Sequence, residues 1–165
     1  MADEAVVNAI ETMLAKDVIS AKMAMAYITV DGRRYKLFQG KKLEAKFDKD
    51  KKELGILGRM AKGNKGTAAK GSGKLTIYKN TPLFDEMMLK FVTTGVDTYF
   101  DMQVSNSDPT SDAGRRTITL LSCNINSATV AAFDVDGDWL EDEIDFTFEG
   151  VKIPENFKIL DGMTL

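Results

Sequence analysis

Strict alternation of apolar and polar residues is the feature of this sequence that most restricts its fold. It runs through residues 74–79 and again through residues 43–48, where Leu43, Ala45 and Phe47 alternate with Glu44, Lys46 and Asp48. This period of two is typical of a strand with one buried and one solvated face. Strand-type residues also fill 25–30 and 35–38, on either side of a turn that contains Asp31-Gly32. Such a chain is expected to build antiparallel β-sheet.

Further strands are predicted over residues 98–104, 116–124, 127–135 and 139–148. A helix is predicted over residues 82–94, because Thr81 suits the N-cap, Pro82 the first helical position and Gly95 the end. Its apolar stripe comprises Leu83, Phe84, Met87, Met88, Phe91 and Val92. The predicted fold class is α+β, mainly β: two packed antiparallel β-sheets forming a sandwich or barrel, with one flanking α-helix.

The ends of the chain are expected to lie outside this β domain, which spans residues 17–150. Residues 1–16 form an N-terminal extension that is predicted to be helical, since apolar residues recur there at spacings of three and four. A frayed terminal arm is the alternative. Residues 151–165 are expected to form a C-terminal tail.

Residues 58–73 are rich in Gly and Lys and have almost no apolar side chains. Such a segment buries too little surface to offset the entropy lost on ordering. We therefore predict a long Gly/Lys-rich loop, about residues 49–72, that is mobile in the free subunit and is ordered by a partner. A long loop inside a compact domain usually serves a function.

The sequence contains few of the residues and motifs that catalytic sites use. Its 165 residues include no histidine and a single cysteine, Cys123, so His-based catalysis and an internal disulfide are both excluded. Residues 68–75 lack the first glycine of a phosphate-binding loop, and the calcium-like run 134–138 is followed by Trp139 where the required glycine should stand. We expect no catalytic residue, no cofactor site and no metal site.

Charge is strongly segregated along the chain, although the net charge is only −3. Residues 41–74 hold eleven basic and four acidic side chains, and residues 134–149 hold eight acidic side chains and no basic one. Two solvated faces would explain this pattern; the alternative is that the patches meet between copies, in a head-to-tail contact that generates rings or filaments. The candidate contact residues are Lys49, Lys51, Lys52, Arg59, Lys62, Lys65, Lys70, Asp134, Asp136, Asp138, Glu141 and Glu143.

A series of short segments also occurs in a characteristic order: 30–32, 71–79, 91–97, the aromatic pair Tyr99-Phe100, Arg116, 124–126, 131–135, 141–143 and 146–149. In order and spacing, over residues 17–150, this series resembles the tail tube (core) proteins of contractile-tailed phages, PBSX-like defective prophages and phage-tail-like bacteriocins of Gram-positive bacteria.

The resemblance implies a structural subunit without enzymatic activity. Six copies would form a ring whose inner sheets join into one β-barrel, and the rings would stack into a hollow tube that conducts DNA in phages without binding it specifically. The implied partners are further copies of the chain, the tail sheath protein, the baseplate and the tape-measure protein, with no membrane. The implied location is the inner tube of the virion tail, after synthesis in the bacterial host cytoplasm. The long loop is expected to reach a neighbouring subunit or ring.

Two other functions stay open at this point. Another ring-forming virion protein, such as a tail terminator or connector, would share the β architecture. A small nucleic-acid-binding module could use the basic stretch 41–74, although Phe47 is its one aromatic residue suited to stacking on bases.

Overall fold

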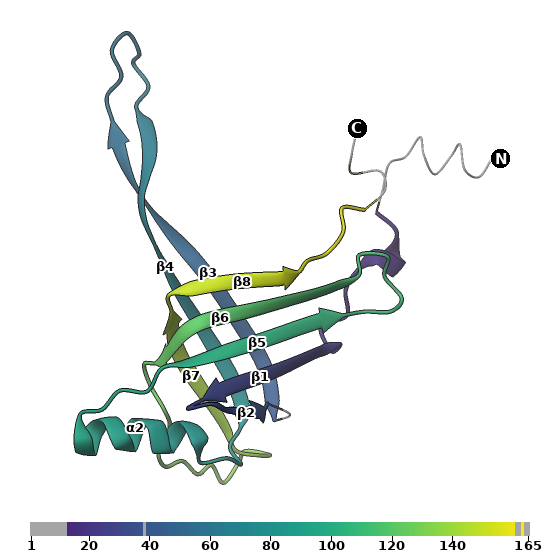
Figure 1. The fold of residues 1–165 in the computed structure, drawn as a ribbon, viewed down its shortest axis with the longest axis vertical. Helices are drawn as coiled ribbons and strands as arrows, with labels where there is room; N and C mark the ends of the chain where they lie inside the picture. The colour runs from purple at the N-terminus through teal and green to yellow at the C-terminus, as the bar shows by residue number, and fades with distance from the viewer. Residues whose placement is uncertain (1–12, 38, 161–162, 164–165) are drawn as a thin grey trace, which may run out of the picture.

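The computed structural model describes residues 13–37, 39–160 and 163. Within them lie eight strands and one α-helix (Figure 1). The strands are β1 (Ala24–Val30), β2 (Arg33–Lys36), β3 (Gly40–Leu54), β4 (Gly63–Tyr78), β5 (Phe100–Ser107), β6 (Arg115–Ile125), β7 (Glu141–Phe148) and β8 (Gly150–Glu155). Helix α2 spans Leu83–Thr94, and a 3-10 turn, η1 (Ala15–Asp17), precedes β1. The helix predicted within residues 1–16 lies outside the described residues, except for 13–16.

All strand pairs are antiparallel, in the order β2-β1-β5-β6-β7-β4-β3, and β8 pairs with β6. β6 joins the two halves of this arrangement, because it pairs with β5 and β8 along most of its length but with β7 only at Asn124 and Ile125. The predicted α+β, mainly β class is confirmed. Its two expected sheets are parts of one hydrogen-bonded eight-stranded sheet that turns over on itself.

The turn in β6 coincides with an irregularity of the backbone. Ser122 has a positive φ of 53°, and the β5–β6 register shifts between Phe100 and Met102. Asp101 Oδ1 accepts a hydrogen bond of 3.1 Å from the Ser122 backbone N–H. A bulge bends a strand and increases its twist. Ser122 therefore marks the point where β6 passes from its β8 partner to its β7 partner.

The core lies between the two halves of the sheet, and α2 closes one end. It contains Ile28, Met102, Leu120 and Cys123 from one half, Leu75, Ile77, Ile144, Phe146 and Phe148 from the other, and Phe84 and Met87 from α2. The helix itself is confirmed, and Gly95, with φ 74°, ends it. Its buried face is narrower than the predicted stripe, because Phe91 is 48% and Val92 70% exposed.

Two other predictions fail in the second half of the chain. Residues 127–135 were expected to form a strand but are irregular, since none of the strands in the described residues lies beside them to satisfy their backbone groups. Val130, Phe133 and Val135 in this stretch are exposed. Residues 150–155, which were expected to belong mostly to a C-terminal tail, form β8 instead.

The prediction of a long loop at residues 49–72 is also wrong, because these residues belong to a β-hairpin. β3 and β4 pair from Gly40 and Ile77 outward to Leu54 and Gly63. β7 stops at the Gly71–Phe148 pair, so beyond it the two strands continue alone. Residues 48–70, the arm, project from the body of the protein (Figure 1). Pairing between the two strands satisfies the backbone polar groups without any apolar core, which is why a polar composition is compatible with strands here.

Two glycines of this hairpin allow aromatic side chains to pack directly against the β4 backbone. A Cβ atom at Gly71 would lie 2.6 Å from Cε2 of Phe148, and one at Gly73 would lie 2.8 Å from Cε2 of Phe146. The Phe148 ring also packs edge-on against Phe47, with the centroids 4.9 Å apart. The glycines thus leave room for two core aromatic rings to cross β4.

Gly73→Ala is expected to destabilise the fold by about 3 kcal/mol, because the new methyl group meets a buried ring and also the Glu44 backbone oxygen at 2.9 Å. Urea unfolding measures the loss. Gly55→Ala is the matched control, since a Cβ there has no atom within 4 Å among the described residues. Equal stability of the two variants would show that the Phe146 ring does not cross β4 at Gly73.

Cys123 is 0% exposed, and burial raises the pKa of its thiol to about 12. The thiolate is the reactive form, so the folded protein is expected to resist alkylation by iodoacetamide at pH 8 and to react fully in urea. Mass spectrometry counts the adducts. Rapid alkylation without denaturant would place Cys123 outside the core.

Candidate functional site

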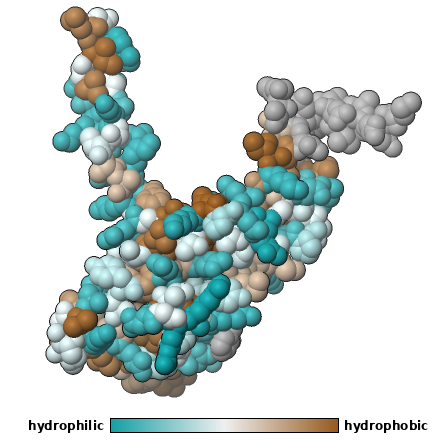
Figure 2. Space-filling view, in the orientation of Figure 1, coloured by the Kyte–Doolittle hydropathy of each residue, from teal (hydrophilic) through white to brown (hydrophobic). Residues whose placement is uncertain are grey.

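The arm is the largest feature of the molecule that has no packing partner in its own chain. Apart from Gly63, which is half-buried, every residue from 48 to 70 is exposed. An isolated two-stranded hairpin is marginally stable in water. Apolar side chains gather at its end (Figure 2), where Leu57 and Met60 are completely exposed. Such a surface is typical of a segment that another molecule covers.

The seven basic candidate residues all lie on the arm: Lys49, Lys51, Lys52, Arg59, Lys62, Lys65 and Lys70. Only three acidic residues accompany them, namely Asp48, Asp50 and Glu53. The ion pairs formed among the described residues all lie elsewhere. The basic charge of the arm is therefore available to a partner.

The five acidic candidates fall into two groups. Asp134, Asp136 and Asp138 lie on the irregular β6–β7 connection, residues 126–140, and are exposed. Glu141 and Glu143 lie on the outward face of β7 and are already paired within the chain, with Lys41 and Lys74 respectively.

These two ion pairs join neighbouring strands of the same sheet. Glu143 Oε1 lies 3.0 Å from Lys74 Nζ, and its hydrogen bond raises the pKa of that lysine. Hydrogen bonds from Lys41 Nζ and from Trp139 Nε1, the latter of 2.7 Å, lower the pKa of Glu141. Glu141 and Glu143 are thus less available to a second copy than the three aspartates.

Within one chain, the basic and acidic candidates do not meet. The arm rises from one end of the long axis, whereas the β6–β7 connection runs past α2 at the other end (Figure 1). A contact between the two groups therefore needs two copies of the chain. That contact remains a prediction.

A buried cluster of charged side chains holds the β6–β7 connection against the body of the protein, and it was not identified from the sequence. Lys79 Nζ lies 3.2 Å from Asp142 Oδ2 and also binds Asp85 in the first turn of α2. Asp142 is 1% exposed, and its Oδ1 accepts a 3.2 Å hydrogen bond from the Thr129 backbone N–H. The signal was available, because Asp142 occupies an inward position in the alternation of β7, in line with Ile144 and Phe146.

The described part of the chain contains neither a cluster of potential metal ligands nor a helix that could cross a membrane. No three His, Cys, Asp or Glu side chains gather there as metal ligands would. The one helix of that part, α2, is too short to cross a membrane.

Comparisons with known proteins give a matching family and several relatives. Residues 11–155 match the model of a family described as phage tail tube protein. The phage-like element PBSX protein XkdM of Bacillus subtilis (strain 168) is 39% identical over 134 residues, which cover 77% of this chain and 91% of XkdM.

Solved structures share the fold at low sequence identity. One is a chain of the PVC sheath-tube complex, from an extracellular contractile injection system in its extended state. It matches with a TM-score of 0.61 at 13% identity, over 90% of this chain and 95% of that chain. The SPP1 tail tube matches with a TM-score of 0.60 at 11% identity, over 87% and 81%.

Proposed function

This chain belongs to the phage tail tube protein family, and from that premise we propose that its copies assemble into stacked rings that form the hollow inner tube of a phage-like contractile tail. The chain is a structural subunit and not an enzyme. The arm is the observation that carries the assembly proposal: a ribbon with an uncovered apolar end and uncompensated basic charge gains its packing from a neighbouring copy.

The position of the charges supports stacking along the long axis. A basic arm at one end and the acidic residues Asp134, Asp136 and Asp138 at the other attract each other when copies align head to tail (Figure 1). A head-to-tail contact that repeats along one axis, without a rotation that closes it into a ring, continues into a filament.

The sheet edges support ring formation. β2 and β3 stand at the two ends of the strand order, and each leaves one row of backbone N–H and C=O groups without a neighbouring strand in the described chain. Unpaired edges invite pairing with another chain, and a closed barrel removes them. We propose rings of six copies, in which the edges of adjacent subunits meet.

The further partners follow from the family. We propose that the tube is a virion tail component made in the host cytoplasm, surrounded by a sheath protein and ended by a baseplate, with a tape-measure protein inside. In a phage, DNA would pass through the lumen without specific binding. The net charge of −3 per subunit supports this, since DNA adheres to surplus Lys and Arg.

Negative-stain microscopy of the concentrated full-length protein tests the proposal. Long hollow filaments of uniform width are expected. Single rings that never stack would favour a tail terminator or connector instead. Tight, steeply salt-dependent DNA binding by a subunit that forms no filaments would favour a nucleic-acid-binding module.

A further inference from the structure

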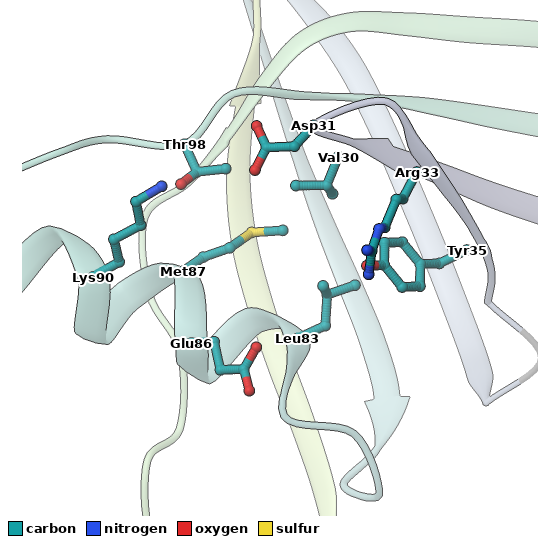
Figure 3. A pocket seen from close by; sticks show the side chains of 9 residues that line it. All are labelled: Val30, Asp31, Arg33, Tyr35, Leu83, Glu86, Met87, Lys90 and Thr98. Carbon is teal, nitrogen blue, oxygen red and sulfur yellow. The ribbon is translucent and has the colours of Figure 1, made fainter.

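A recess of about 350 Å³ lies between α2 and the β1–β2 hairpin (Figure 3). Val30, Leu83 and Met87 extend into it and form the apolar part of its lining, beside the polar groups of Tyr35 and Thr98. Four charged side chains stand around the opening. Asp31 and Glu86 lie on opposite sides of it, with Lys90 and Arg33 on the two sides between them (Figure 3).

The end of the arm combines exposed apolar side chains with basic ones. Leu57 and Met60 are completely exposed, and the basic side chains of Arg59 and Lys62 stand beside them. Gly58, with a positive φ of 83°, lets the chain turn tightly between the two strands. The result is a narrow apolar projection with a basic border.

We propose that Leu57 and Met60 of one copy insert into this recess of a second copy in the adjacent ring. This inference rests on the proposed tube. The end of the arm and α2 lie at opposite ends of the long axis and on the same side of the molecule (Figure 1). A copy displaced along that axis therefore brings its α2 to the arm of the copy before it.

The charges around the recess orient the contact. Arg59 and Lys62 are attracted by Asp31 and Glu86 and repelled by Arg33 and Lys90. Because acidic and basic side chains alternate around the opening, the basic border of the arm fits in only a restricted set of rotations. Insertion would thus fix the register between rings as well as hold them together.

The exposed apolar residues of the β6–β7 connection are the alternative surface that could contact the end of the arm. Phe133 is 89% and Val135 88% exposed, so these side chains themselves protrude and offer no hollow that could receive a projection. The recess is instead a hollow, and Val30, Leu83 and Met87 are among the side chains that line it. The observations favour the recess.

Disulfide trapping in assembled tubes tests the contact, and the buried Cys123 gives no background. Leu57→Cys with Glu86→Cys is expected to give a ladder of cross-linked multimers on a non-reducing gel after mild oxidation of the tubes. Leu57→Cys alone should give none. A ladder from Leu57→Cys with Val135→Cys in its place, or no ladder from either pair, would overturn the inference while the tubes, and so the proposed function, stand.

Leu57→Asp gives a second readout. It is expected to raise the subunit concentration needed for tubes at least about tenfold, with an unchanged melting temperature, since the Leu57 side chain is completely exposed among the described residues. Thr67→Asp adds the same charge elsewhere on the arm and should have a smaller effect. Equal effects of the two would contradict insertion. If the unmodified protein forms no tubes at all, the proposed function fails first.

Discussion

Replacing residues 50–68 with a two-residue Asn-Gly turn is expected to give a subunit that folds normally and forms no tubes. The replacement keeps the Lys49–Ala69 pair and every contact of β3 and β4 with the body, including Phe47 with Phe148. Asn-Gly suits a two-residue hairpin turn. The removed residues are exposed, apart from the half-buried Gly63, so the core loses nothing.

Thermal unfolding and negative-stain microscopy of the same preparation separate folding from assembly. The shortened variant should have a melting temperature close to that of the unmodified protein and should sediment as a monomer. Lys65→Arg with Lys70→Arg, which keeps both the length and the charge of the arm, should assemble normally. Tubes from the shortened variant would show that the arm is not an assembly element.

Lys79→Met is expected to cost about 3–5 kcal/mol of unfolding free energy, because it leaves the carboxylate of Asp142 buried without its cation. Both partners are well shielded, with side-chain exposures of 15% for Lys79 and 1% for Asp142. The lost cluster also ties α2 to the β6–β7 connection through Asp85 and Thr129. Urea unfolding at pH 7 gives the value.

Two further measurements check the origin of that loss. Lys41→Met breaks the exposed pair with Glu141 and should cost much less, since solvent screens that pair. Lys79→Met with Asp142→Leu should recover part of the loss, because no uncompensated charge then stays buried. A single Lys79→Met variant as stable as the unmodified protein would contradict the buried pair.

The same cluster predicts a loss of stability in alkali. Burial opposes the charged form of Lys79, but its hydrogen bonds to Asp85 and Asp142 outweigh burial and raise its pKa above the ordinary 10.5. A raised folded pKa contributes stability below the unfolded pKa, and this contribution is lost as the pH rises through the folded value. The difference in unfolding free energy between the unmodified protein and Lys79→Met should therefore have its full size at pH 7 and become smaller above about pH 10.5.

Local patterns predicted much of this fold. The alternation at residues 74–79 and the capping signals around residues 82–94 report on short-range structure, and both elements are present. The same reasoning failed at residues 127–135, because alternation says nothing about whether a second strand lies alongside. It failed on the arm for the opposite reason: β3 and β4 pair there without burying either face, so no hydrophobic pattern marks them.

The candidate contact residues show the same limit. The charge segregation was visible in the sequence, and the family resemblance that it accompanied is confirmed. The partners of Glu141 and Glu143 were not visible, because Lys41 and Lys74 become their neighbours only through the β3–β4–β7 register. Likewise, Gly71 and Gly73 suggested flexibility in the sequence, whereas the rings of Phe148 and Phe146 give them a packing role.

A cryo-EM reconstruction of tubes grown from the purified full-length chain tests the proposed assembly most directly. We expect sixfold rings in which residues 48–70 of each subunit leave their own ring and contact the next, with the α2 end of the body facing the incoming arm. Arms that fold back within their own ring, or stacks in which the arm is solvent-exposed, would contradict it.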